Sequence, residues 1–154
     1  MATLHIMVGL PCSGKTTRAK QLEAEHNAIR LTPDEWQLRL FGDDVGDPDH
    51  DRRHTEIERI MWEIAEHALS SGVNVVQDYG LWGRDERDDF KARAIALGAD
   101  WELHVMDVSR EELFHRLHKR NAEAPGGVFI IPDFEMESYL KVYQPPTPDE
   151  WEKG

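Results

Sequence analysis

Residues 9–16 read Gly-Leu-Pro-Cys-Ser-Gly-Lys-Thr and fit the pattern G-x-x-x-x-G-K-[ST], which strongly limits how the surrounding chain can fold. The apolar run at residues 4–8 is typical of a short buried strand, and residues 16–25 carry the spacing of a helix. In such a unit the loop N–H groups point toward phosphate oxygens, and the helix dipole adds positive potential. The sequence therefore predicts a nucleoside triphosphate site. Its loop residues are Gly9, Pro11, Cys12, Ser13, Gly14, Lys15, Thr16 and Thr17.

The lysine and threonine that close this pattern indicate the chemistry at the phosphates. We expect Lys15 to reach the β- and γ-phosphates of ATP and the Thr16 hydroxyl to ligate Mg²⁺. A glycine turn that merely opens a helix would explain the glycines but not the Lys-Thr pair. Asp78 ends a predicted valine-rich strand, where it could hold Mg²⁺ or substrate; a structural aspartate at a strand end is the alternative.

The composition favours one globular domain over residues 1–154 and limits its partners. Acidic residues number 30 against 18 basic ones, and the formal net charge of −12 disfavours binding to an extended nucleic acid. Small neutral or cationic substrates are compatible with this balance. No apolar stretch is long enough to span a bilayer, and the N-terminus lacks a secretory segment, so we expect a cytoplasmic location. A single cysteine excludes an internal disulfide, and the oligomeric state stays open.

Strand-like and helix-like apolar spacing alternate along the chain, which is typical of an α/β fold with a parallel sheet. The strongest helical period begins at Ile57 and continues to Ala68, and the polar segment 42–55 before it is predicted to be mostly loop. Prolines predict an extended segment at residues 144–148. Further strands are predicted at 28–31, 73–78 and 101–105, and further helices at 33–41, 84–97, 109–120 and 133–143.

Asp34 is the candidate for orienting a hydroxyl acceptor and taking its proton. It begins the predicted helix 33–41 directly after a strand, so we expect it to face the phosphate loop. Thr32 and Glu35 have the spacing of a capping box around it. The alternative is that Asp34 only stabilises the positive end of the helix.

Three further residues are candidates for contact with the substrate. Arg39 lies about one helical turn after Asp34, Trp36 adjoins the same aspartate, and Arg84 follows the strand that ends at Asp78. Each also has a structural interpretation, as a solvated arginine, a core tryptophan and an exposed charge near a helix start. The sequence alone leaves both interpretations open.

Two polar clusters have weaker functional interpretations. The aspartates of segment 43–51 could recognise a cationic acceptor such as an amino sugar, although a solvated loop is the better interpretation. His50 and His54 are four residues apart and flanked by aspartates, which is one pattern of a metal site. Mg²⁺ bound with ATP already supplies a metal and prefers oxygen ligands, so this second interpretation is also the weaker one.

Arg116 and Arg120 are four residues apart and therefore share one face of a predicted helix. They precede Pro125-Gly126-Gly127, a segment with the composition of a hinge. The alternative is a solvated helix face on which both arginines pair with nearby glutamates. We retain both arginines as candidates for binding phosphate.

The order of these parts resembles the small P-loop kinases, especially the branch with polynucleotide 5′-hydroxyl kinases, gluconate kinases and chloramphenicol phosphotransferase. The resemblance covers nearly the whole chain and rests on the segments 9–17, 32–34, 75–78, 116–121 and 145–150. It implies a three-layer α/β sandwich with a mainly parallel sheet in the order 2-3-1-4 and a C-terminal helical lid at about 110–143. The chain departs at Cys12, where such loops usually carry glycine or another small residue, and no fifth strand is obvious after the lid.

The resemblance also implies catalytic roles. In these kinases an aspartate at the position of Asp34 contacts the acceptor hydroxyl, and lid arginines such as Arg116 or Arg120 clamp the transferring phosphate. With Lys15, these residues predict an ATP-dependent phosphotransferase that moves the γ-phosphate to a hydroxyl of a small molecule. A polynucleotide 5′-hydroxyl kinase is the alternative enzyme, and a regulatory nucleotide-binding ATPase without a phosphate acceptor is the alternative of another class.

Overall fold

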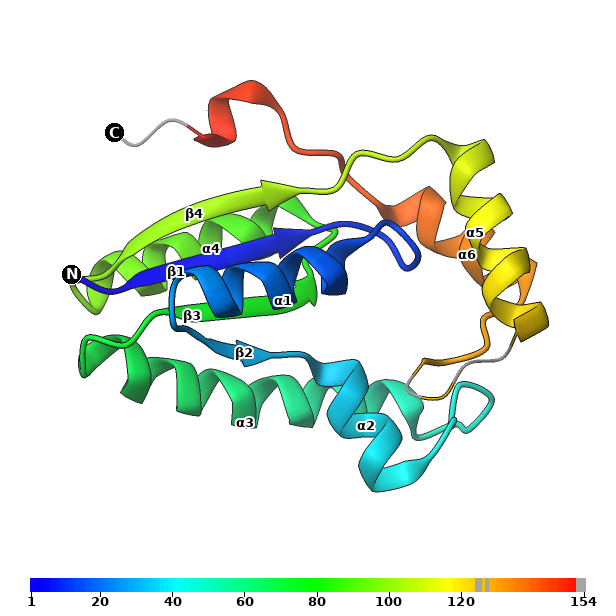
Figure 1. Ribbon diagram of the computed structural model, residues 1–154, viewed down its shortest axis with the longest axis horizontal. Helices are drawn as coiled ribbons and strands as arrows, with labels where there is room; N and C mark the ends of the chain where they lie inside the picture. The colour runs from blue at the N-terminus through cyan, green and yellow to red at the C-terminus, as the bar shows by residue number, and fades with distance from the viewer. Residues whose placement is uncertain (124–125, 127, 152–154) are drawn as a thin grey trace.

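The computed structural model describes residues 1–123, 126 and 128–151. Its strands form one parallel sheet in the order β2-β3-β1-β4, with β1 between β3 and β4 (Figure 1). This arrangement confirms the predicted α/β fold and strand order. The strands are β1 (Thr3–Val8), β2 (Ile29–Leu31), β3 (Val75–Gly80) and β4 (Asp100–Val105).

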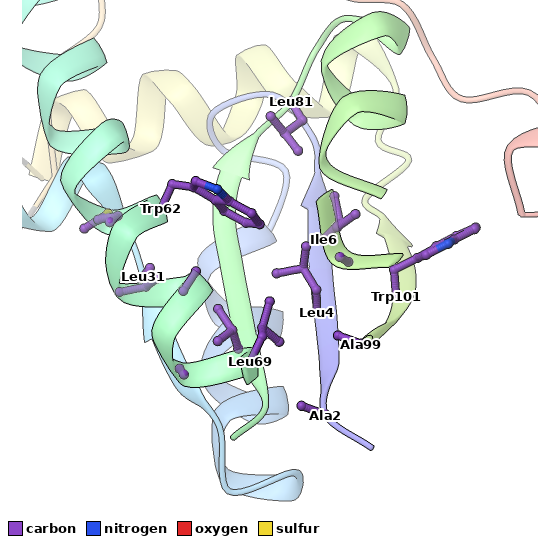
Figure 2. Packing of buried hydrophobic residues seen from close by; sticks show 14 of the residues in the cluster. Ala2, Leu4, Ile6, Leu31, Trp62, Leu69, Leu81, Ala99 and Trp101 are labelled. Atoms are coloured by element: carbon purple, nitrogen blue, oxygen red, sulfur yellow. The ribbon is translucent and has the colours of Figure 1, made fainter. Parts of the chain in front are cut away.

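Helices cover both faces of the sheet and make the three layers. Helix α1 (Lys15–Glu25) packs against Met7 and Val76 on one face, while α3 (His50–Ser70) and α4 (Arg84–Ala96) cover the other. Figure 2 shows Trp62 and Leu69 projecting from α3 toward the central strand β1. Because apolar residues of β1 are buried on both faces, the strand forms the centre of the core.

Three of the remaining helices lie beyond the carboxyl ends of the strands, and the last, a short 3₁₀ helix, lies alongside β4 (Figure 1). They are α2 (Pro33–Phe41), α5 (Arg110–Glu123), α6 (Asp133–Val142) and the short 3₁₀ helix η1 (Pro148–Trp151). Residues 144–147 form neither helix nor strand, and η1 begins at Pro148, the last residue of the predicted extended segment. Within the described residues, no helix has both the length and the apolar character needed to cross a membrane.

Helix α3 begins at His50, so the second half of the segment 42–55 is helical rather than loop. The cause is Asp44, which is buried and accepts hydrogen bonds from Gln37 Nε2, His50 Nδ1 and Arg53 Nη1 at 3.1, 2.7 and 3.1 Å. Burial opposes ionisation of Asp44, but these hydrogen bonds outweigh it and lower the pKa of its carboxyl to about 2. Asp44 is therefore a structural residue that anchors the first turn of α3, not part of a solvated acidic loop.

The side-chain hydrogen bonds of the predicted capping box at the start of α2 are not formed. Thr32 is the residue before α2, as predicted, but its hydroxyl donates a hydrogen bond to Asp78 Oδ2 at 2.9 Å. The Glu35 carboxylate accepts a hydrogen bond from Arg30 Nη1 at 3.0 Å. The side chains of Thr32 and Glu35 therefore bind residues of β3 and β2, respectively, and not the backbone of α2.

Candidate active site

The phosphate-binding pattern forms the tight loop between β1 and α1, at the carboxyl end of the central strand. A Cβ atom on Gly9 would lie 2.6 Å from Ser13 Oγ and 3.2 Å from Met106 Cβ, so a larger residue here would have to displace Ser13. Gly14, at the start of α1, has a φ of 89°, which glycine adopts without strain. The two glycines of the pattern are thus explained by packing at one position and by backbone conformation at the other.

Asp78 connects the loop to two strands. Its Oδ1 accepts from Lys15 Nζ at 2.6 Å, and its Oδ2 accepts from the hydroxyls of Thr16 and Thr32 at 2.8 and 2.9 Å. The Asp78 carboxylate is buried, so these charge-assisted hydrogen bonds are shielded from water. The structure therefore brings Thr16 and Asp78, the predicted metal residues, into direct contact. Their oxygen donors fit Mg²⁺, which prefers hard oxygen ligands.

Cys12 adopts a φ of 69°, in the left-handed region that favours glycine. This finding explains why its position is one where glycine is common in related loops. Burial raises the pKa of the Cys12 thiol, although the positive charges of Arg120 and Arg116 act against that change. The thiol is therefore neutral, and it packs from the phosphate loop against the apolar cluster that includes Leu117 and Phe129.

The variant Cys12→Gly is expected to keep nucleotide affinity within about threefold of the parent, because left-handed strain of roughly 1–2 kcal/mol is relieved. Greater flexibility of glycine and loss of thiol packing offset part of that gain. Cys12→Val places a branched Cβ in the left-handed region and is expected to weaken nucleotide binding by about tenfold or more. Titration with a fluorescent ATP analogue measures both changes. Cys12→Ala is the control, since it removes only the thiol; weakened binding in that variant would contradict the backbone explanation.

Both predicted lid arginines line the first cavity, but only Arg116 hydrogen-bonds to the phosphate loop. Arg116 Nη1 donates to the carbonyl oxygen of Cys12 at 3.2 Å, while its Nε donates to Glu112 at 3.0 Å. Arg120 Nη2 donates to the carbonyl oxygen of Phe129 at 3.2 Å. The predicted hinge cannot be placed in the same way, because Pro125 and Gly127 lie outside the described residues.

A cavity of about 850 Å³ opens over the phosphate loop between α1, α2 and α5. The described side chains that line it carry five positive charges and two negative ones. A surplus of cations and a preformed phosphate loop suit a triphosphate. Its charged lining residues are Lys15, Lys20, Arg39, Arg116, Arg120, Asp34 and Glu35.

A second cavity of about 450 Å³ lies beside the first, between α3, α6 and the segment after β3. Four carboxylates and one lysine are the acidic and basic groups among the described residues of its lining, together with two histidines. Burial, with the negative charges of Glu86 and Asp34, raises the pKa of Glu58 to about 7. Several aromatic rings complete the wall. Its carboxylates are Asp34, Asp51, Glu58 and Glu86, and its aromatic residues are Tyr79, Trp82, Phe129 and Tyr139.

Asp34 lines both cavities and is exposed, as is expected for a group that must reach a substrate. Its Oδ1 lies 3.8 Å from Nδ1 of His54, which also contacts Gln37 Oε1 at 3.0 Å. Burial lowers the pKa of His54 although the charge of Asp34 opposes this change. Lys15 is the other charged residue shared by the two cavities among the described residues. The two cavities therefore meet at a lysine and a carboxylate.

Two predicted substrate residues lie elsewhere. Arg84 Nη2 donates to Asp149 Oδ2 at 2.6 Å and Arg84 Nη1 donates to the Thr147 hydroxyl at 3.1 Å, outside both cavities. Trp36 is half-buried and packs against the main core. The structure thus brings Asp34, Arg39 and the loop residues together, but not Arg84 or Trp36.

The sequence interpretation missed His54 as a neighbour of Asp34 and missed Glu58 altogether. Residues 50, 54 and 58 are each separated by four, so they share one face of α3 once the helix begins at His50. A prediction that started this helix at His50 instead of near Ile57 would have placed these three residues on one face. The burial of Asp44, which fixes that start, depends on contacts that no local pattern specifies.

Comparisons with known proteins agree with this geometry. The family model of AAA_33, described as an AAA domain, matches residues 4–146. A comparison with curated proteins finds no match. A chain in the structure of the Pnkp1/Rnl/Hen1 RNA repair complex is 26% identical with a TM-score of 0.68, covering 91% of this chain but 43% of the other.

Two further structures share the fold at lower identity. Kti12 from Chaetomium thermophilum in complex with ADP-AlF3 is 18% identical with a TM-score of 0.72, over 94% of this chain and 82% of the other. A gluconokinase from Sinorhizobium meliloti 1021 is 19% identical with a TM-score of 0.62, over 96% and 78% of the two chains. The fold is therefore that of the P-loop kinases and their relatives.

Proposed function

This chain belongs to the AAA_33 family, and on that premise we propose that it is an ATP-dependent phosphotransferase with a small-molecule hydroxyl acceptor. The observation that carries this proposal is the meeting of two cavities of opposite charge at Lys15 and Asp34. A cationic cavity suits the nucleotide, and the acidic, aromatic one suits an acceptor that is not an anion. A phosphoryl group that passes from one ligand to the other would cross this boundary.

On the donor side, the phosphate loop and the dipole of α1 bind the triphosphate. Lys15 neutralises the β- and γ-phosphates, and Arg116 or Arg120 stabilises charge that develops on the transferred group. Thr16 and Asp78 would hold Mg²⁺, which supplies further charge neutralisation to the phosphates when it is bound. These roles need positioned cations rather than a covalent intermediate.

On the acceptor side, Asp34 orients the hydroxyl and takes its proton as the oxygen attacks the γ-phosphorus. The bond between the γ-phosphorus and the bridging oxygen breaks, and ADP leaves with that oxygen. His54 Nδ1 lies 3.8 Å from the Asp34 carboxylate and contacts Gln37 Oε1 at 3.0 Å, so the imidazole borders the acceptor side of Asp34. The aromatic rings and the partly ionised Glu58 favour a neutral or amine-bearing ring compound, such as a sugar or an amino sugar.

The proposal is tested by incubating the protein with γ-labelled ATP and Mg²⁺ against pools of sugars, amino sugars, nucleosides, amine-bearing antibiotics and oligonucleotides. We expect label to move to a neutral or cationic small molecule, in a reaction that Lys15→Ala abolishes. Nucleotide binding without transfer to any pool would contradict the proposal. Binding of a protein partner only in the presence of ATP would then favour a regulatory ATPase.

A polynucleotide 5′-hydroxyl kinase is the second candidate. It is favoured by the 26% identity to a chain of an RNA repair complex, which exceeds the identity to the gluconokinase. The four carboxylates that line the second cavity oppose it, because they repel the phosphates that follow a 5′ end. Preferential labelling of 5′-hydroxyl oligonucleotides over all small molecules would establish this alternative.

A further inference from the structure

Two histidines and a glutamate gather on the sheet face that carries α1. Strands β1 and β4 run parallel, with His5 opposite Glu102 and Met7 opposite His104. Alternate residues of a strand share a face, so the three polar side chains project on the side where Met7 packs against α1. None of the three lines either cavity of the candidate active site. Their function is therefore not explained by phosphoryl transfer.

Three potential ligand atoms of this cluster point toward one another. His5 Nδ1 lies 3.0 Å from His104 Nε2 and 3.5 Å from Glu102 Oε2, and the last two atoms are 3.6 Å apart. Zinc bonds to nitrogen and oxygen of about 2.0–2.2 Å place neighbouring ligand atoms of a tetrahedron roughly 3.3–3.6 Å apart. The observed triangle has nearly the dimensions of one face of such a tetrahedron.

The protonation of the cluster also suits a metal. Burial, together with the nearby His104 and His26, lowers the pKa of His5 to about 4. Burial likewise lowers the pKa of His104. Burial thus disfavours the charged form of both rings, and the half-exposed Glu102 supplies a negative charge and access to solvent. The nearby cation Arg18 is paired with Glu25 at 3.4 Å.

We propose that His5, Glu102 and His104 form a zinc site, with a fourth position open to solvent. Two imidazoles and one carboxylate favour Zn²⁺ over Mg²⁺, which prefers oxygen ligands and octahedral geometry. A hydrogen bond between His5 Nδ1 and His104 Nε2 would account for these two nitrogen atoms but not for the Glu102 carboxylate oxygen beside them. A dication contacts all three atoms at once.

The site has one feature that limits its affinity. His5 Nε2 is buried and has no hydrogen-bond partner among the described residues, so no acceptor fixes the tautomer of this ring. Sites that lack such an outer partner lose about 10–100-fold in affinity, and we expect dissociation constants on the order of micromolar. Because β4 is an edge strand, bound zinc would tie the sheet edge to its centre.

The test is calorimetric titration of the full chain with ZnCl₂ in buffer free of nucleotide, because ATP itself binds Zn²⁺. We expect one zinc per chain and a rise in Tm of roughly 5–10 °C at a hundredfold excess over Kd. Glu102→Gln keeps the size of its exposed side chain and is expected to weaken zinc binding by at least about tenfold. His104→Ala is expected to weaken it further.

The control is His67→Ala, which removes an exposed histidine from α3 and is expected to leave zinc binding unchanged. A circular dichroism spectrum and Tm without zinc show that each variant is folded. Undetectable zinc binding by the parent chain would overturn the proposal. Equal binding by the folded Glu102→Gln and His104→Ala variants would overturn it as well, because the zinc would then be held elsewhere.

Discussion

Replacement of Asp34 by asparagine is expected to lower the rate of phosphoryl transfer by about 10²–10⁴-fold while nucleotide affinity stays nearly unchanged. The amide has nearly the size of the carboxylate but cannot take the proton of the attacking hydroxyl. Among the described residues no hydrogen bond joins Asp34 to the phosphate loop, and its carboxylate lies 3.8 Å from His54 Nδ1. The measurements are kcat with the acceptor found by the labelling panel and ATP affinity by equilibrium titration.

The matched control is Asp89→Asn, which makes the same chemical change on the exposed face of α4, where Asp89 pairs with Arg93. We expect its transfer rate and ATP affinity to equal those of the parent. Undiminished transfer by Asp34→Asn would remove Asp34 from the role of general base. An equal loss of ATP affinity and transfer would instead place Asp34 in the nucleotide site.

Glu150→Ala is expected to lower the free energy of unfolding by about 3–5 kcal/mol, because it strands a buried guanidinium. The Arg87 side chain is fully buried and donates to both oxygens of Glu150, with Nε–Oε1 at 2.7 Å and Nη2–Oε2 at 3.1 Å. Thr147 N donates to the same carboxylate at 2.8 Å. Urea denaturation measures the change, with the midpoint shifting at an almost unchanged slope.

Asp149→Ala serves as the control for this second prediction. It removes an exposed carboxylate from the same 3₁₀ helix, and its partner Arg84 stays solvated, so the unfolding midpoint should hardly move. The double variant Arg87→Met/Glu150→Met replaces the pair by apolar side chains of similar size and is expected to recover much of the loss. A midpoint for Glu150→Ala equal to that of Asp149→Ala would show that the buried pair contributes little.

Much of the fold could be predicted because its signals are local. The pattern at 9–16 specifies a strand, a loop and a helix, and the apolar period from Ile57 specifies the buried face of α3. The strand order came from a resemblance to a family and not from spacing. Local patterns failed where a polar side chain has a distant partner. The Thr32 hydroxyl donates to Asp78 instead of capping α2, and Asp44 binds His50 in the first turn of α3, so that the helix begins earlier than predicted.

In the candidate site, too, features with a local signal could be predicted and features that depend on distant contacts could not. Contact between Thr16 and Asp78 could be predicted, because the carboxyl ends of adjacent parallel strands meet at one edge of a sheet. The position of Arg84 outside both cavities could not be predicted, since its partner Asp149 comes from the distant C-terminal segment. The acidic wall that includes Glu58 could not be predicted, because it is assembled from α3, α4 and α2 only after folding.

The ion pair between Arg87 and Glu150 has a consequence for the second cavity, the proposed acceptor site. The remaining donor of Arg87, Nη1, donates to the carbonyl oxygens of Leu81 and Trp82 at 3.0 and 3.1 Å. Both of those residues line the second cavity, whereas Glu150 does not. Through Arg87, Glu150 therefore helps to fix the backbone of Leu81 and Trp82 although it does not itself line the cavity. We expect substitutions near residue 150 to change acceptor affinity more than nucleotide affinity.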